Sequence, residues 1–259
     1  MPLRDFGWIW EGQGVDPGVY PSILGVGDGA RYFGLRKVCY MFHPNDEFAM
    51  QRLADMEEVV CDISKWKWTT TPDGGIKGLP DSSKQTVVEE AKKVSELSTT
   101  YANISGAIHD DFLGLARRYG YSPQDYEEVY QALKSRNDSL KLWIVVYTHE
   151  LSEENWDPFR KFVDVVNLWV WNSKDLVRLD EDIERCRSLF PGKPLILGCY
   201  LRDYPAKRPM PIQSLEYQWK LVRRRIEDGT IQGFSILGSI LIDSHRAQSE
   251  WIRRFLLGG

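Results

Sequence analysis

The segment with the clearest chemical character is residues 104–112, in which an apolar run ends in His109, Asp110 and Asp111. Two adjacent carboxyl groups can take different pKa values, because the charge on one disfavours ionisation of the other. One can then serve as an acid while its neighbour stays ionised. Adjacent strand residues point to opposite sides, so the two need not reach the same ligand. The alternative is a structural pair that caps or tethers a loop.

Polar and aromatic residues also follow the ends of seven other apolar runs. Six of the ten tryptophans lie at or just after such ends: Trp8, Trp10, Trp66, Trp68, Trp169 and Trp171. Aromatic faces there suit stacking against the apolar faces of sugar rings. The alternative is that these indoles only fill the core and cover loops. The residues are Trp8, Trp10 and Glu11; Phe42 and His43; Asp62, Lys65 and Trp66; Tyr147, His149 and Glu150; Trp169, Trp171 and Asn172; Tyr200, Arg202 and Asp203; and Ser235 and Ser239.

Motifs for several other chemistries are missing from the sequence. The four cysteines form no CxxC pair, and no HxH pair, GxSxG elbow, GxGxxG turn or GxxxxGK[ST] loop occurs. We therefore expect no metal and no cofactor. One constellation stays open as an ion site, formed by His43, His109, Asp110 and His149.

The elements that must position these residues alternate between strands and helices along the chain. Alternation of this kind indicates a parallel sheet, and eight such units in 259 residues predict one (β/α)8 barrel domain over residues 1–259. A doubly wound open sheet is the rival architecture. The predicted strands are Phe6–Trp10, Lys37–Phe42, Val59–Ile63, Ile104–Asp110, Leu140–Tyr147, Val163–Trp171, Pro194–Leu201 and Ile231–Leu237.

Helices are expected between most of these strands, and one long polar loop interrupts the pattern. The loop, Ser64–Ser82, is expected to cover part of the barrel mouth and to bring Trp66 or Trp68 to the pocket. The predicted helices are Asp46–Met56, Ser83–Tyr101, one that begins at Ser122-Pro123, Glu153–Phe162, Ser173–Phe190, Ser214–Asp228 and Ser244–Leu257.

Active sites of such barrels lie at the carboxyl ends of the strands, and alternation along each strand predicts which side chains face inward. The aliphatic residues of each run should face the helices. The inward sets are then Asn167, Trp169 and Trp171; Gly198, Tyr200 and Arg202; and Val145, Tyr147 and His149.

The segment ending in Asp110 and Asp111 resembles the G-x-x-x-D-D-[FY] ending of strand four in glycoside-hydrolase-like barrels. Gly106, Asp110, Asp111 and Phe112 match, and His109 is displaced by one place from the usual histidine. The resemblance implies a carbohydrate-active enzyme with Asp110 or Asp111 as acid or nucleophile. Two familiar patterns are absent: a pair of glutamates after strands four and seven, and a D-x-D-x-E run.

The second catalytic carboxyl therefore stays open between Asp203, Asp62 and Glu11. Tyr147, Tyr200, Arg202 and Asn172 are candidates for positioning sugar hydroxyl groups. His109 or His149 could tune a neighbouring carboxyl or accept a hydroxyl proton.

The residue pattern and the resemblance disagree on which carboxyl faces substrate. If Ile104 and Ile108 face the helices, His109 and Asp111 point inward. The resemblance instead favours Asp110. An end to regular pleating near His109 would reconcile the two. We expect at least one of these carboxyls to reach the pocket with Tyr147 or His149 nearby.

Composition limits the partners. The 33 Lys and Arg against 37 Asp and Glu give a net charge of −4, which disfavours nucleic acid. No apolar run reaches the ~18 residues of a membrane span. We expect a soluble protein that binds a carbohydrate or another small molecule. The first residues, Met1–Asp5, carry no apolar signal core; export with the leader already removed stays open, as does the oligomeric state.

Two other functions remain open beside a glycoside hydrolase. The first is a sugar-binding barrel that keeps the tryptophan platform without a competent acid pair. The second is an unrelated lyase or isomerase that acts on a phosphorylated substrate, with Gly233–Ser239 approaching the phosphate.

Overall fold

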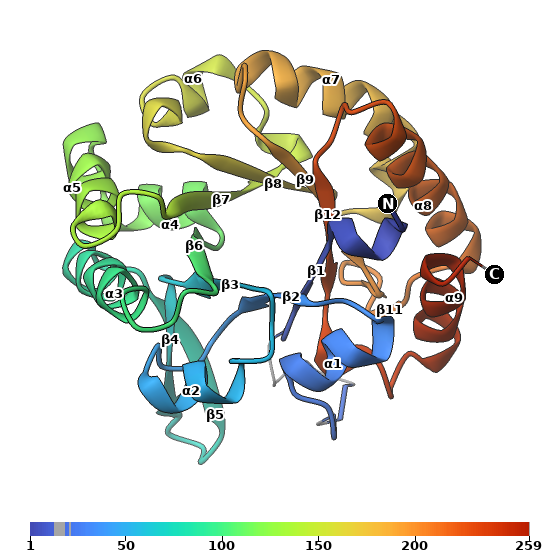
Figure 1. Ribbon diagram of the computed structural model, residues 1–259, viewed down its shortest axis with the longest axis horizontal. Coiled ribbons are helices and arrows are strands. Elements are labelled where there is room, and N and C mark those ends of the chain that lie inside the picture. The colour runs from blue at the N-terminus through green and yellow to red at the C-terminus, as the bar shows by residue number, and fades with distance from the viewer. Residues whose placement is uncertain (13–18, 21, 259) are drawn as a thin grey trace.

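A computed structural model describes residues 1–12, 19–20 and 22–258; the side chains of residues 66–69 and 76–80 lie outside that description. Its centre is a closed barrel of eight parallel strands (Figure 1). Around the barrel these strands follow their order in the chain. This confirms the predicted (β/α)8 barrel and excludes the rival open sheet. They are β1 (Gly7–Trp10), β2 (Lys37–Tyr40), β3 (Glu58–Asp62), β6 (Ile104–His109), β7 (Lys141–Tyr147), β8 (Val165–Trp169), β9 (Leu195–Tyr200) and β12 (Gly233–Leu237).

Helices surround the barrel (Figure 1). They are α1 (Val26–Phe33), α2 (Glu47–Arg52), α3 (Lys84–Leu97), α4 (Phe112–Tyr119), α5 (Pro123–Lys134), α6 (Glu153–Trp156), α7 (Leu179–Leu189), α8 (Ile212–Glu227) and α9 (Arg246–Leu256). Short 3-10 turns occur at Leu3–Phe6, Thr148–Glu150, Arg160–Phe162, Ser173–Arg178 and Ser239–Leu241. Among the described residues, no helix combines the length and apolar character needed to cross a bilayer.

The start of α5 shows how local sequence sets an element. The Ser122 hydroxyl accepts from the backbone N–H of Asp125, and the Asp125 carboxylate accepts from the Ser122 N–H. This capping box, followed by Pro123 at the first helical position, confirms the predicted helix start.

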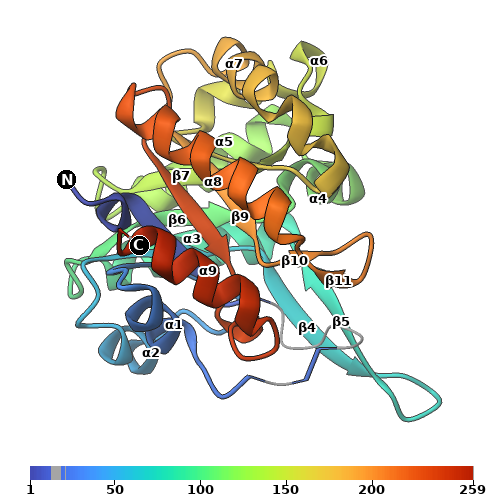
Figure 2. The same ribbon diagram turned by 90° about the vertical axis from the view of Figure 1, so that its right-hand side faces the viewer.

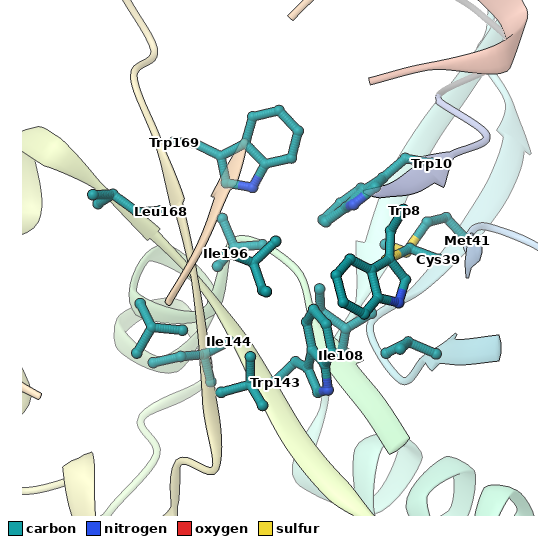
Figure 3. Packing of buried hydrophobic residues seen from close by; sticks show 14 of the residues in the cluster. Trp8, Trp10, Cys39, Met41, Ile108, Trp143, Ile144, Leu168, Trp169 and Ile196 are labelled. Atoms are coloured by element: carbon teal, nitrogen blue, oxygen red, sulfur yellow. The ribbon is translucent and has the colours of Figure 1, made fainter. Parts of the chain in front are cut away.

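Large indoles fill the barrel interior, and glycines make room for them. Trp8 meets Trp143 edge to face, and Trp10 meets Trp169 in the same way, each with ring centroids 5.2 Å apart (Figure 3). A Cβ atom at Gly198 would lie 2.0 Å from the Trp169 ring. Trp169 therefore fits because the neighbouring strand β9 lacks a side chain at that level.

Several predicted helices are shorter than expected, and two of them differ most from the prediction. The predicted helix Glu153–Phe162 ends at Trp156, because Pro158 lacks the N–H group that a helix interior needs. The predicted helix Ser173–Phe190 begins as a 3-10 turn and becomes α-helical only at Leu179.

The polar segment 64–82 is a hairpin rather than the predicted loop. Its strands are β4 (Lys65–Thr70) and β5 (Ile76–Asp81), which pair antiparallel. The alternation of Trp66 and Trp68 with lysines, followed by threonines and by Pro72-Asp73-Gly74-Gly75, is a hairpin signal. In Figure 2 this hairpin projects on the same side of the barrel as the hairpin of β10 (Arg202–Asp203) and β11 (Arg208–Pro209).

Two helices had no counterpart in the prediction, α1 and α4. The glycines of α1 lower its helix propensity, so the sequence pattern did not predict this helix. Gly29 is nevertheless needed, because a Cβ atom there would lie 2.5 Å from the Ser239 side chain. Tight packing of α1 on the barrel thus overrides the local preference.

All four cysteines are free thiols and fully buried. Burial raises the pKa of the Cys61 thiol to about 12 and shifts the other three in the same direction. The thiols therefore pack as small apolar groups.

Candidate active site

A cavity of about 170 Å³ opens where the barrel strands end. Its lining combines two carboxyl groups with aromatic rings, and none of the described side chains that line it is cationic. The lining residues are Trp10, Phe42, Asp110, Asp111, Val145, Tyr147, Trp169, Trp171, Tyr200, Tyr204 and Leu237.

Both adjacent carboxyls reach this cavity because the strand stops just before them. The regular strand β6 ends at His109, and Asp111 has a left-handed backbone (φ 48°, ψ 32°). The Asp111 N–H donates to Asp110 Oδ1 at 2.9 Å. The expectation that strand geometry sends the two side chains to opposite sides is therefore wrong. The end of pleating near His109 reconciles the two alternatives.

Asp111 is held by a tyrosine from the next strand. The Tyr147 hydroxyl donates to Asp111 Oδ1 at 2.7 Å, and the Tyr200 hydroxyl is in turn hydrogen-bonded to Tyr147. The prediction that a carboxyl reaches the pocket beside Tyr147 is thus confirmed. The chain of hydroxyl groups fixes the orientation of the Asp111 carboxyl.

The two carboxyls differ in acidity. Burial first, and then the charges of Asp111 and Asp62, raise the pKa of Asp110 well above its usual range. Burial also raises the pKa of Asp111, but the Tyr147 hydrogen bond and the charge of Arg118 oppose that rise. Asp110 is therefore the group that holds a proton, and Asp111 is the group that ionises first.

Aromatic rings form the floor and rim of the cavity. Trp10, Trp169 and Tyr200 are buried at its floor. Trp171 lies at the rim with 43% of its surface exposed, and stacks on Tyr204 at 5.6 Å. Within the described part of the chain, the indole N–H groups of Trp10 and Trp169 meet no acceptor. Such donors suit a ligand that brings oxygen atoms.

His109 lies away from the cavity, against the sequence expectation. Its ring is buried among Phe112, Tyr121 and Tyr126, between the barrel and the helices outside it. Burial lowers the pKa of His109 to about 3, so the ring is neutral. The alternation in β6 is the reverse of the one predicted: Ile108 points into the barrel beside Trp143 (Figure 3), and His109 points out.

Asp62 and Asp203, two candidates for the second carboxyl, are not among the residues that line the cavity. Asp62 is fully buried and accepts from Ser64 N at 2.7 Å and from Phe42 N at 3.3 Å. It thereby holds the left-handed backbone of Phe42 (φ 66°), whose ring lines the cavity. Asp203 is buried and accepts from the Ser173 hydroxyl at 2.7 Å.

Three other candidates also have contacts outside the cavity. Glu11, the third carboxyl candidate, pairs with His43 Nε2 at 3.1 Å. Buried Arg202 lies 3.4 Å from His245 Nε2. Asn172 caps a 3-10 turn by accepting from the Lys174 N–H.

His149 and the hairpin tryptophans complete the set of candidates. His149 is exposed and stacks on the ring of Tyr147, with centroids 5.4 Å apart. The side chains of Trp66 and Trp68 lie outside the described residues, so their expected place at the pocket stays a prediction.

Sequence reasoning missed two lining residues, Tyr204 and Leu237. Leu237 ends β12, and alternation from Ser235 would have placed it inward. Tyr204 follows strand β10 in the loop after β9. Loops at the carboxyl ends of barrel strands build the site, so an aromatic residue there was a usable signal.

No group of three or more potential metal ligands occurs among the described His, Cys, Asp and Glu residues. No family model and no curated protein matches the chain in sequence. Known structures do match its fold. A chitinase from Chromobacterium violaceum ATCC 12472 aligns with a TM-score of 0.58 and 10% identity, over 96% of this chain and 98% of that chain. The PgaB (BpsB) glycoside hydrolase domain from Bordetella bronchiseptica aligns with a TM-score of 0.56 and 12% identity, over 98% and 99%.

The chain shares its (β/α)8 barrel fold with these proteins. A β-glucuronidase from Bacteroides uniformis also aligns, with a TM-score of 0.57 and 12% identity over 92% of this chain. The chain spans only 30% of the length of that enzyme. The predicted resemblance to glycoside-hydrolase barrels is confirmed for the fold, and identities this low extend it no further.

Proposed function

We propose that the protein is a glycoside hydrolase that acts at the barrel mouth through Asp110 and Asp111. The observation that carries the proposal is the adjacent carboxyl pair, Asp110 and Asp111, facing a cavity walled by aromatic rings. The shared barrel fold is consistent with it. A phosphorylated substrate is disfavoured, because two carboxyls and no described cationic side chain line the cavity.

The acidities suggest a division of roles within the pair. Asp110, which holds its proton, donates it to the glycosidic oxygen as the bond to the anomeric carbon breaks. Asp111, oriented by Tyr147, provides negative charge beside the positive charge that develops on the sugar. A water molecule then adds to the anomeric carbon and returns a proton to Asp110. The indole and phenol rings hold the sugar during this sequence.

The test replaces each carboxyl by its isosteric amide. We expect Asp110→Asn and Asp111→Asn each to lower kcat/KM on a cleaved glycan by about 100-fold or more, since proton transfer or charge stabilisation is lost. Asn also tolerates the left-handed backbone at position 111, so folding should persist. The measurement is hydrolysis across a panel of oligosaccharides, with circular dichroism to confirm folding.

Asp157→Asn is the matched control, because Asp157 forms an exposed ion pair with Arg160 and does not line the cavity. It should hydrolyse at the wild-type rate. Hydrolysis at the wild-type rate in both site variants would contradict the proposal and favour a sugar-binding barrel.

A further inference from the structure

Four aromatic rings from the floor and the rim of the cavity pack together into a cluster that we call the aromatic box. Trp171 and Tyr204 stack nearly parallel, with an angle of 13° between their planes. Tyr200 stands edge-on to both, at 84° to Trp171 and 72° to Tyr204. Tyr147 forms a further wall, at 84° to Trp171. All four rings line the cavity, so that aromatic surface makes up much of its wall.

The charged groups that line the cavity beside this box carry negative charge when ionised. Asp110 and Asp111 lie at its edge, and no cationic side chain occurs among the described lining residues. Arg118 acts on Asp111 from the exposed surface of α4. Arg202 is buried against His245. Neither arginine supplies a positive charge within the cavity lining.

We propose that this cavity recognises a positively charged amino group on a sugar ring, so that the substrate class is amino sugars with a free amine. The inference rests on the proposed function and narrows its substrate. Aromatic faces attract ammonium groups, and the attraction strengthens where water is excluded. An ionised carboxylate at the edge of the box adds to it.

The same arrangement selects against other sugars. An N-acetylated amine carries no charge and gains neither interaction. A uronic acid would bring a third carboxylate toward Asp110 and Asp111, and like charges in a partly dry site repel. The unpartnered indole N–H groups of Trp10 and Trp169 can meanwhile donate to the hydroxyl oxygens that all sugars share. Selectivity therefore comes from the charge, and general sugar affinity from the indoles.

Binding of simple probes tests this inference without any hydrolysis. Glucosamine, N-acetylglucosamine, glucose and glucuronic acid are titrated at mildly acidic pH and constant ionic strength, with tryptophan fluorescence as the readout. We expect glucosamine to bind at least about tenfold more tightly than the other three. Tetramethylammonium chloride, but not sodium chloride, should compete with it.

Two variants locate the effect. Trp171→Leu removes one wall of the box, and Asp111→Asn removes charge; each should reduce the preference for glucosamine over glucose to about threefold or less. Trp251→Leu is the control, because Trp251 packs on Phe255 of α9 and does not line the cavity. It should keep the preference.

The outcomes separate this inference from the proposed function. Equal or tighter binding of glucose or N-acetylglucosamine, or no saturable binding of any probe, overturns the amino-sugar inference even if some neutral glycan is cleaved. A clear preference for glucosamine without cleavage of any amino-sugar oligosaccharide supports the inference and overturns the hydrolase proposal.

Discussion

At the residue scale, the backbone of one amino acid decides the composition of the site. A left-handed conformation at Asp111 turns the chain so that two adjacent carboxyls share a cavity. Outside glycine, Asp and Asn are among the residues that tolerate this conformation best. The same residue therefore provides both the turn and a functional group, and a change at position 111 can affect either.

The raised pKa of Asp110 predicts that the site lowers stability at neutral pH. Between the ordinary carboxyl pKa and the raised value, the folded state binds more protons than the unfolded state, so stability falls as pH rises. Asp110→Asn removes this loss. We expect its free energy of unfolding to exceed that of the wild type at neutral pH, with the difference shrinking at pH below the ordinary carboxyl pKa.

Urea unfolding of both proteins across that pH range measures the effect. Asp157→Asn, at the exposed ion pair, should show no such pH-dependent gain. A wild-type protein more stable than Asp110→Asn at neutral pH would mean that Asp110 is ionised and stabilised in the folded state.

At the element scale, the floor of the cavity depends on a glycine in a neighbouring strand. The Trp169 ring lies over Gly198 of β9, where a Cβ atom would come within 2.0 Å of it. We predict that Gly198→Ala destabilises the protein by about 1–3 kcal/mol and displaces the indole into the cavity. Ligand affinity should then fall as well.

Thermal unfolding and tryptophan fluorescence titration measure the two effects together. Gly114→Ala is the control, because a Cβ atom at that helical glycine meets nothing within 4 Å. Equal stability of Gly198→Ala and the wild type would show that Trp169 can move at little energetic cost.

The sequence was most informative where elements obey regular periodicity. Strand order, the start of α5 and the inward direction of Trp169 and Tyr200 all follow from alternation and capping rules. Alternation failed at His109, because Ile108 was expected on the wrong face of a strand buried on both sides. It also gave no warning of the left-handed Asp111, because no spacing rule encodes where pleating stops.

At the scale of the whole molecule, the two ends of the barrel have different tasks. The cavity and both hairpins lie at the carboxyl ends of the strands, and the N-terminus lies at the opposite end (Figure 2). In this fold, residues at the amino end contribute to stability rather than to chemistry. Asp164, which directly precedes β8 at the amino end, is an example of such a stabilising residue. It accepts from Lys134 Nζ at 2.8 Å and from the Leu142 N–H at 2.9 Å.

We predict that Asp164→Asn lowers the free energy of unfolding by about 1–3 kcal/mol and leaves kcat/KM unchanged. The loss arises because the partly buried Lys134 amine no longer faces the carboxylate with which it forms an ion pair. Urea unfolding and the hydrolysis assay, run on the same preparation, measure both quantities. A large fall in kcat/KM at full folding would show that the two ends of the barrel are coupled.

The four buried thiols allow the rate at which parts of the fold open to be measured by chemical labelling. A thiol-specific reagent cannot reach a buried sulfur in the folded protein, so labelling should await each opening event. In the folded protein, we expect no cysteine to be labelled within the time that an exposed thiol needs to react. In urea, all four cysteines should be labelled. Mass spectrometry would assign each label to a cysteine. Because the four cysteines lie in β2, β3, α7 and β9, the order of labelling would show which of these elements opens first.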